Sequence, residues 1–404
     1  MISTRRVALF SLLALTVLAP EPILARRTMS VRMPAFDVPP RSDREICTFV
    51  PLPLRRPVNV TDLIIDNLTS NPSFATHHVI AFAYVGDLAP LAGMERRIFD
   101  DPACTNFGAG PATRQFLALA QGVRARFPTP HGTALRLTPG TLANGQRALG
   151  LLFNAHWING SDETQQARAR MKLVLTKDRA VKRQLKPIFD VIACIFIKVP
   201  PGETGIVGYR WAPGNPGLSG VGAAAFGGVA PPDGPACVTV LTSHMHRRGK
   251  LFTADFVAQD SAPERVYENT VYADPPARRF DPPLLVRVGD EIAYACTHDN
   301  ATDPRLGCEE VAGVTPGITP MESIARTGDL TRFLGAARLC HIPGPNPQEC
   351  PPGPDPLQPD RTLTGNCVPA NLVFGFLSED DMCALPGYYY DAAPAAPPGQ
   401  ECIL

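Results

Sequence analysis

Five histidines are the residues of this chain whose spacing is best suited to metal chemistry. His77 and His78 are adjacent, His156 lies in an apolar stretch, and His244 and His246 are separated by one residue. Side chains two residues apart share one face of a β-strand, so the imidazoles of an HxH pair can converge on one metal ion. Adjacent side chains point to opposite faces, so the HH pair converges only where the strand is locally distorted.

Met382 is the sixth candidate ligand. It lies in the segment GFLSEDDMCALPGYYYD, between acidic residues and Cys383. Thioether sulfur is a soft ligand that selects copper over zinc and over hard cations. All six positions also have a plainer interpretation, because a histidine in an apolar strand is usually a core or solvated residue and a methionine often only fills space.

The segments that carry these residues are predicted to be β-strands. Short runs rich in branched and aromatic residues, bounded by Gly, Pro, Asn and Asp, occur along the whole chain, which is typical of β-sandwich proteins. The runs with candidate ligands are HHVIAFAYV, ALGLLFNAHWI and CVTVLTSHMH, and CIFIKV is another expected strand. Only two stretches, 113–127 and 320–339, have a helical pattern.

A chain of 404 residues is expected to form about two domains. A boundary at VPPGETG gives an N-terminal β-sandwich domain over 40–199 and a C-terminal β-sandwich domain over 204–404. The second domain contains a Pro- and Cys-rich insertion, 300–366, with the short helix at 320–339. Because the insertion is too long for an ordinary connection, it is either a functional cap or a surface decoration held by disulfides.

Residues 1–25 are expected to be an export signal. Arg5 and Arg6 precede an apolar run that is too short to span a membrane, and Ala25 offers a small residue for cleavage. Eleven cysteines then imply an oxidising compartment, so the protein is expected to be secreted or periplasmic. The odd number leaves at least one thiol free or paired between chains.

The charge balance argues against two classes of partner. The chain has 38 basic and 38 acidic residues, so its formal net charge is zero. It therefore gives no reason to expect nucleic acid or an anionic membrane surface as a partner. No segment is long enough for stable membrane insertion either.

The order HH, H, HxH and MC in an exported β-protein resembles the type II copper, ascorbate-dependent monooxygenases, the family of peptidylglycine α-hydroxylating monooxygenase and dopamine β-monooxygenase. The resemblance covers roughly residues 45–300 and 365–404. It implies two β-sandwich domains that each hold one copper ion and face each other across a solvent-filled cleft. It also implies that dioxygen and an ascorbate-like reductant are used to hydroxylate a C–H bond of a small organic substrate.

The resemblance assigns a role to each candidate ligand. It implies an electron-transfer copper in the first domain, held by His77, His78 and His156. It implies a catalytic, oxygen-activating copper in the second domain, held by His244, His246 and Met382. Three disulfides are suggested in the same way: Cys47–Cys194, Cys237–Cys402 and Cys296–Cys383. The partners of the remaining cysteines stay open: Cys104, Cys308, Cys340, Cys350 and Cys367.

Two positions depart from the peptidylglycine enzymes. Thr242 replaces an arginine that holds the peptide carboxylate, and Pro386 replaces a tyrosine that helps to bind it. The substrate is therefore not expected to be a C-terminal glycine peptide. The alternative to an enzyme is an exported copper-binding or copper-handling protein without hydroxylase activity. A purely structural sandwich module would leave the five histidines unexplained.

Overall fold

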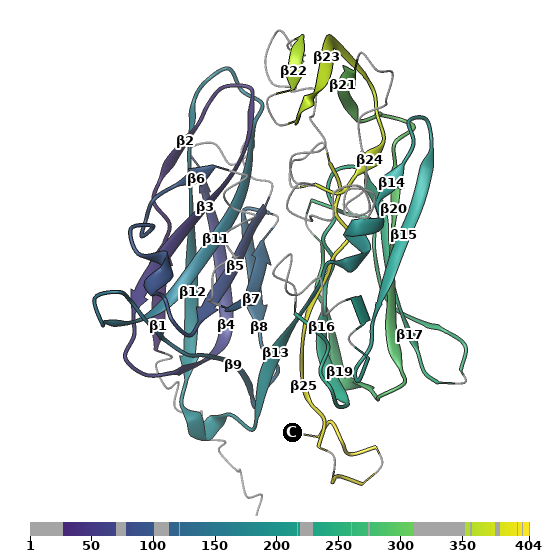
Figure 1. The fold of residues 1–404 in the computed structure, drawn as a ribbon. Helices are drawn as coiled ribbons and strands as arrows, with labels where there is room; N and C mark the ends of the chain where they lie inside the picture. Colours follow the sequence, from purple (N-terminus) through teal and green to yellow (C-terminus); the bar gives the residue numbers. More distant parts are fainter. Residues whose placement is uncertain are drawn as a thin grey trace, which may run out of the picture.

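The chain is all-β in the computed structural model, as expected (Figure 1). The structure describes residues 27–69, 78–100, 113–120, 122–215, 217–218, 229–259, 261–273, 275–310, 352–355, 358–375, 380–393, 395–397 and 399–403. The expected export signal, His77, and the expected helix at 320–339 lie outside these residues. In the described part of the chain, no helix has the length and apolarity needed to cross a membrane.

The first sandwich consists of two facing layers (Figure 1). One layer has the strand order β1 (Thr28–Arg32), β12 (Gln165–Thr176), β4 (Val58–Thr69), β9 (Thr133–Leu137) and β13 (Arg183–Asp190), with β2 (Phe36–Val38) on β12 and β8 (Arg124–Pro128) on β4. The other has the order β6 (Phe99–Asp100), β3 (Ser42–Pro53), β11 (Arg147–Asn159), β5 (His78–Val85) and β7 (Thr113–Ala120), with β10 (Gly140–Thr141) on β11.

The second sandwich repeats this arrangement with fewer strands. One layer contains β25 (Leu385–Asp391), β16 (Ala236–Leu241) and β19 (Arg278–Val286). The other contains β15 (Thr204–Trp211), β20 (Glu291–Asp299), β17 (Gly249–Val257) and β18 (Glu264–Asn269). Small sheets are formed by β14 (Lys198–Val199) with β24 (Leu372–Val373), and by β21 (Leu306–Glu310), β23 (Gln358–Pro369) and β22 (Gly353–Asp355). The last three strands come mostly from the described ends of the insertion.

Strand β13 belongs to both sandwiches. Its first residues, 183–185, pair in parallel with β9, and residues 186–190 pair antiparallel with β25. A single ten-stranded sheet therefore runs from the first sandwich into the second. The boundary expected at 199–205 falls between β14 and β15, but hydrogen bonds of the main sheet cross it because β25 comes from the end of the chain.

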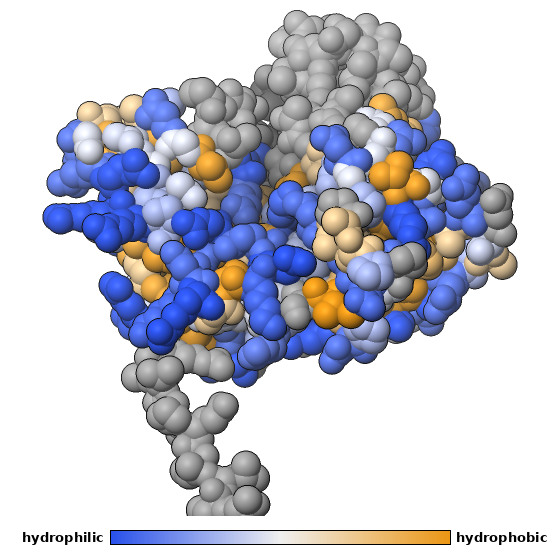
Figure 2. Space-filling view, turned by 90° about the horizontal axis from the view of Figure 1, so that it is seen from below, coloured by the Kyte–Doolittle hydropathy of each residue, from blue (hydrophilic) through white to orange (hydrophobic). Residues whose placement is uncertain are grey.

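The strands of this sheet separate polar from apolar residues by simple alternation. On β12, Ala167, Ala169 and Met171 are buried, whereas Arg168 and Lys172 are exposed and Arg170 is partly exposed. Alternate side chains of a strand point to opposite faces, so the first set faces the core and the second faces solvent. Hydrophilic residues accordingly cover much of the surface of the molecule when it is seen from below (Figure 2).

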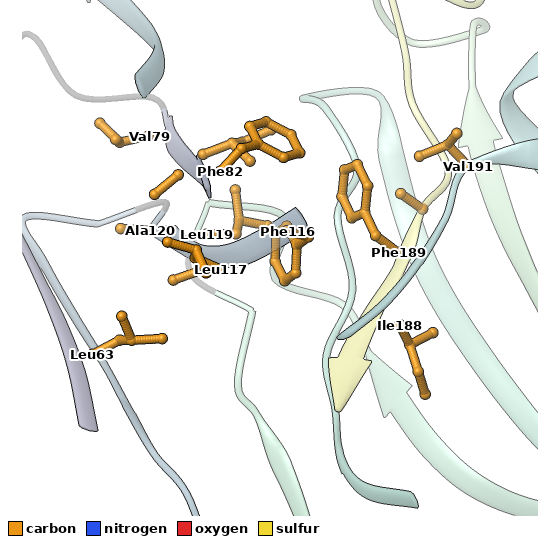
Figure 3. Packing of buried hydrophobic residues seen from close by; sticks show 14 of the residues in the cluster. Leu63, Val79, Phe82, Phe116, Leu117, Leu119, Ala120, Ile188, Phe189 and Val191 are labelled. Carbon is orange, nitrogen blue, oxygen red and sulfur yellow. The ribbon is translucent and has the colours of Figure 1, made fainter. Parts of the chain in front are cut away.

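An aromatic core joins the two sandwiches. Phe116 of β7 stacks on Phe189 of β13, with ring centroids 4.7 Å apart and an interplanar angle of 4° (Figure 3). Phe82 of β5 packs against both rings, at 6.2 Å and 5.8 Å. The Tyr388 hydroxyl of β25 donates a hydrogen bond to the Leu117 carbonyl of β7. The buried apolar residues consequently form one continuous cluster through both halves of the molecule.

Two local predictions are wrong. The helix expected over 113–127 is instead β7 and β8, because residues 113–120 pair with β5 along their whole length and residues 116–120 are buried on both faces. Tertiary pairing has overridden the helical pattern. The strand expected for CIFIKV is replaced by a 3₁₀-helix, Ile192–Phe196, followed by the two-residue β14.

Replacing Phe189 with alanine is predicted to weaken the whole molecule rather than one half of it. The ring is 3% exposed and packs on two other phenylalanines, so we expect a loss of about 3–5 kcal/mol in the free energy of unfolding. Denaturant unfolding followed by far-UV circular dichroism measures this. Phe196→Ala is the matched control, because that ring is 38% exposed. Equal losses for both variants would contradict a shared core.

Candidate metal centre

His78 and His156 are direct cross-strand neighbours. His78 begins β5 and lies opposite His156 of β11 in the register, and the two ring centroids are 5.2 Å apart. Glu45 of β3 lies opposite His156 on its other side, so Glu45, His156 and His78 form one row across three adjacent strands. Asn154 donates a hydrogen bond from Nδ2 to Oε1 of Glu45 at 2.7 Å. The first sandwich therefore presents two imidazoles side by side on one face.

His244 and His246 come from the second sandwich, but not from within a strand as predicted. Strand β16 ends at Leu241, and its register shifts between Val238 and Val240. The segment after it still pairs with the chain before β25: backbone hydrogen bonds join His244 and Ala384 in both directions, at 3.1 Å and 3.0 Å. His246 and Met382 each lie two residues beyond this bridge, outside any strand pairing, and Met382 is 5% exposed.

Four described candidate ligands form a single cluster: His78, His156, His244 and His246. The His78 ring centroid is 5.2 Å from that of His244 and 6.0 Å from that of His246. His244 and His246 are 5.3 Å apart, and His156 and His246 are 6.4 Å apart. The resemblance implied two ligand sets separated by a solvent-filled cleft, and this is wrong for the described residues. The continuous core and the shared strand β13 bring the two sets together.

Three of these histidines could hold one metal ion. Ring nitrogens of His78, His244 and His246 all lie within 4.8 Å of one another. This trio takes one histidine from one predicted site and two from the other, so the ligands of the two predicted sites are adjacent in space.

The electrostatics of the cluster suit a metal ligand. His156, His244 and His246 are fully buried. Burial, together with the neighbouring rings of His246 and His156, lowers the pKa of His244 well below its usual value of 6.5, so this imidazole is neutral and has a lone pair to offer. Neither ring nitrogen of His244 has a hydrogen-bond partner in the described structure, although both are buried. A buried imidazole in that position fits a bound metal ion.

Asp381 connects the two segments that carry His246 and Met382. Its Oδ1 accepts a hydrogen bond from the backbone N–H of His246 at 2.9 Å and from that of Met382 at 2.7 Å. Its Oδ2 lies 3.1 Å from Nδ1 of His298. Burial alone would raise the pKa of the Asp381 carboxyl, but His298, His246 and the donated N–H outweigh it and hold the pKa below its usual range. Asp381 is therefore an anion that holds the backbone of the candidate ligands His246 and Met382 in place.

The tautomer of His246 is set by a neighbouring carbonyl. Nδ1 of His246 lies 3.3 Å from the backbone oxygen of Asp380, which can only accept a hydrogen bond. With the proton on Nδ1, Nε2 carries the lone pair. Histidines that bind metals usually donate their other ring N–H in this way.

Sequence analysis missed both Asp381 and His298. His298 lies in β20 and is fully buried. The signal was the alternation of EIAYACTHD, in which positions 292, 294, 296 and 298 face inward. A ring nitrogen of His298 also lies within 4.8 Å of the sulfurs of Cys296 and Cys383, but those sulfurs are joined to each other in a disulfide.

Two of the three suggested disulfides are present. Cys237–Cys402 and Cys296–Cys383 are formed, so these pairings are confirmed. The Cys47–Cys194 pairing is wrong, because Cys194 is a free thiol while Cys47 is disulfide-bonded. The Cys194 sulfur lies 3.2 Å from both the N–H and the carbonyl oxygen of Cys383. Burial raises the pKa of this thiol to about 12, which keeps it protonated and unreactive.

Comparisons with known proteins give little information. No family model and no curated protein match the chain. Among solved structures, it is weakly similar to a decameric BFDV capsid protein (11% identity, 37% of this chain and 100% of that chain, TM-score 0.18). It is also weakly similar to the STIV MCP (9% identity, 67% of this chain and 96% of that chain, TM-score 0.23). A third similar structure is the PBSX exported protein XepA (7% identity, 67% of this chain and 86% of that chain, TM-score 0.16). Scores this low support no argument about function.

Asp381→Asn is predicted to weaken metal binding without unfolding the protein. The amide keeps the size of the side chain but loses the charge that faces His298, so the ligand segments lose part of their anchor. We expect a 10- to 100-fold lower affinity for zinc or copper, measured by competition with a chelator. Asp290→Asn is the matched control, because that buried carboxylate also accepts two backbone N–H groups, those of Gln259 and Arg287. An unchanged affinity for Asp381→Asn would contradict its role.

The metal-free protein is predicted to lose stability as the pH falls below about 6.5. In that range the unfolded chain protonates His244, whereas the folded chain does not, so the unfolded state binds more protons. One such histidine lowers the free energy of unfolding by about 1.4 kcal/mol per pH unit until the folded pKa is reached. Urea unfolding at a series of pH values should show a shallower slope for His244→Asn. The same slope in wild type and variant would contradict this; His131→Asn, at an exposed position, serves as the control.

Proposed function

We propose that this protein is a copper-dependent monooxygenase that hydroxylates a C–H bond of a small organic substrate. Dioxygen and an ascorbate-like reductant are the co-substrates in this proposal. The observation that carries it is the convergence of His78, His156, His244 and His246 from two sandwiches into one buried cluster. The order of these residues along the chain, with Met382, is the order that the copper monooxygenases use.

Each residue has a defined part in the proposal. Neutral imidazoles of His78, His244 and His246 would hold copper, since burial keeps at least His244 unprotonated. Met382 would add a soft ligand that tolerates Cu(I), because its segment pairs with that of His244. Asp381 holds His246 and Met382 in position. Copper bound there would supply dioxygen activation and one-electron transfer.

The expectation of two copper ions per chain is kept, with their positions revised. The ring centroid of His78 lies 5.2 Å from that of His244 and 6.0 Å from that of His246, so the ligands of the two predicted sites lie side by side. Buried surroundings exclude water from the reaction, which limits the loss of activated oxygen.

Thr242 and Pro386, the two positions that differ from the peptidylglycine enzymes, lie next to each other. The backbone N–H of Thr242 donates to the carbonyl of Pro386 at 2.9 Å, so the two replaced positions face each other across the same strand pair. Neither side chain carries a charge. The substrate of the proposed reaction is therefore one that does not need a carboxylate to be held at this position.

Copper handling without turnover is the second candidate. Full burial of His156, His244 and His246 favours it, because a substrate must reach an oxygen-activating metal. The disulfides agree with our proposal that the protein acts outside the cytoplasm, and both candidates share that location.

Copper loading followed by exhaustive dialysis is the first test. We expect two equivalents per chain in the wild type, and a loss of at least one equivalent in His244→Ala because that ring belongs to the buried trio. His131→Ala is the matched control, since His131 is an exposed histidine away from the cluster. Loss of binding is then read by metal analysis and by the copper electron paramagnetic resonance spectrum.

The outcomes separate the two candidates. Two equivalents together with ascorbate-driven, substrate-dependent oxygen uptake would support the monooxygenase. Copper binding that depends on His244, without oxygen uptake for any small organic substrate tried, would favour copper handling. Binding that survives in His244→Ala would overturn both.

A further inference from the structure

The outer face of the first sandwich carries a concentrated positive charge. Two rows of paired residues cross β1, β12, β4 and β8: Arg32, Arg170, Asp66 and Arg124 in the first, and Ser30, Lys172, Ile64 and Arg126 in the second. Arg168 lies beside the first row, two residues before Arg170. These four strands therefore present six cations and two carboxylates on this face, counting Asp62 of β4.

The two carboxylates are partners of the cations and lie beneath them. Asp66 is 8% exposed and accepts two hydrogen bonds from Arg170, at 3.0 Å and 2.7 Å. Asp62 is 2% exposed and accepts one from Arg126 at 2.8 Å. Solvent thus meets guanidinium groups rather than carboxylates. The surface is positive even where ion pairs exist.

Three cations of this face have no ion-pair partner in the described structure: Arg32, Arg168 and Lys172. All three are exposed. Arg32 lies directly opposite Arg170, and like charges in opposite positions of an antiparallel pair destabilise a sheet. Arg168, Arg170 and Lys172 repeat every second residue of β12, about 6.8 Å apart.

The formal net charge of zero gives no indication of the positive charge on this face. Basic and acidic residues are equal in number, so a positive face here means that negative charge lies elsewhere. The net-charge argument against an anionic partner therefore does not hold for this face.

We propose that this face docks on an anionic lipid surface. The cations spread over four neighbouring strands spaced about 4.8 Å apart, which makes a broad positive array that is complementary in charge to a layer of phosphate headgroups. A single-stranded nucleic acid would need aromatic rings for stacking, and none of the outward residues of these four strands is aromatic. Guanidinium groups bind phosphate oxygens in pairs, and five of the six cations are arginines.

The docking is peripheral and electrostatic. Of the apolar residues on this face, Ile64 is buried (8% exposed) and Leu68 is only partly exposed. Binding should therefore weaken steeply as salt is added. The face is built from different elements than the histidine cluster, so this proposal is independent of the proposed function.

Vesicle co-sedimentation tests the proposal with the full chain. We expect the wild type to bind vesicles that contain phosphatidylglycerol at low salt and to dissociate from them at about 0.5 M salt. It should not bind vesicles of pure phosphatidylcholine. The triple variant Arg32→Gln, Arg168→Gln, Lys172→Gln should bind about 100-fold more weakly. Its fold should be retained, because these residues are exposed and Asp62 and Asp66 keep their partners.

A triple variant of the second sandwich is the matched control. Arg210→Gln, Lys250→Gln and Arg279→Gln removes the same charge from exposed positions and should bind within about twofold of wild type. A wild type that ignores phosphatidylglycerol vesicles, or equal weakening by both triple variants, would overturn the proposal. Tighter binding of a soluble polyanion such as heparin, lost in the first triple variant, would reject the lipid assignment.

A measurement on the wild-type protein tests the proposal without any variant that could be misfolded. Lys172 is the one lysine of β1, β12, β4 and β8. Vesicles should protect it from acetylation, measured by mass spectrometry, while Lys250 of the second sandwich stays reactive. Equal labelling of both lysines with and without vesicles would count against the docking face.

Discussion

Strand β13 is hydrogen-bonded into both sandwiches, and the position of the second-sandwich ligands relative to the first-sandwich ligands depends on that strand. Its first residues extend the sheet of the first sandwich through β9, and its later residues receive β25 from the far end of the chain. Because β25 follows directly on the segment that holds Met382 and pairs with His244, fixing β25 also fixes the second set of ligands. The aromatic contacts of Phe189 then lock β13 against the strands of the first sandwich.

Burying four imidazoles at such a junction has a cost that the surroundings must offset. Each ring brings two nitrogens into a region without solvent, and an unsatisfied buried polar atom destabilises the fold. The chain meets part of this cost with Asp381, which accepts two backbone N–H groups and faces His298. It also keeps His244 neutral. A metal ion would satisfy the remaining lone pairs, which is why the cluster favours metal binding over a purely structural role.

Charge is organised on two scales in this protein. At the junction, a single buried carboxylate is matched to the groups around it. On the outer face of the first sandwich, arginines and a lysine surround two buried aspartates. Both arrangements follow from alternation along strands, which sends one set of residues to the core and the other to solvent. The same rule therefore produces a candidate metal centre inside and a candidate docking face outside.

The sequence by itself determined the class of fold and the identity of the candidate ligands. Alternating, Pro- and Gly-bounded runs are local features, so they predicted the strands that carry His78 and His156, and two disulfide pairings implied by the resemblance are present. Only the tertiary structure decided that the two histidine sets meet, because their proximity depends on β13, a contact between distant parts of the chain. It also decided that residues 113–120 form a strand, that Cys194 stays free, and that Asp381 and His298 support the cluster. Pairing across long sequence separations sets all of these, and such pairing leaves no local trace in the order of residues.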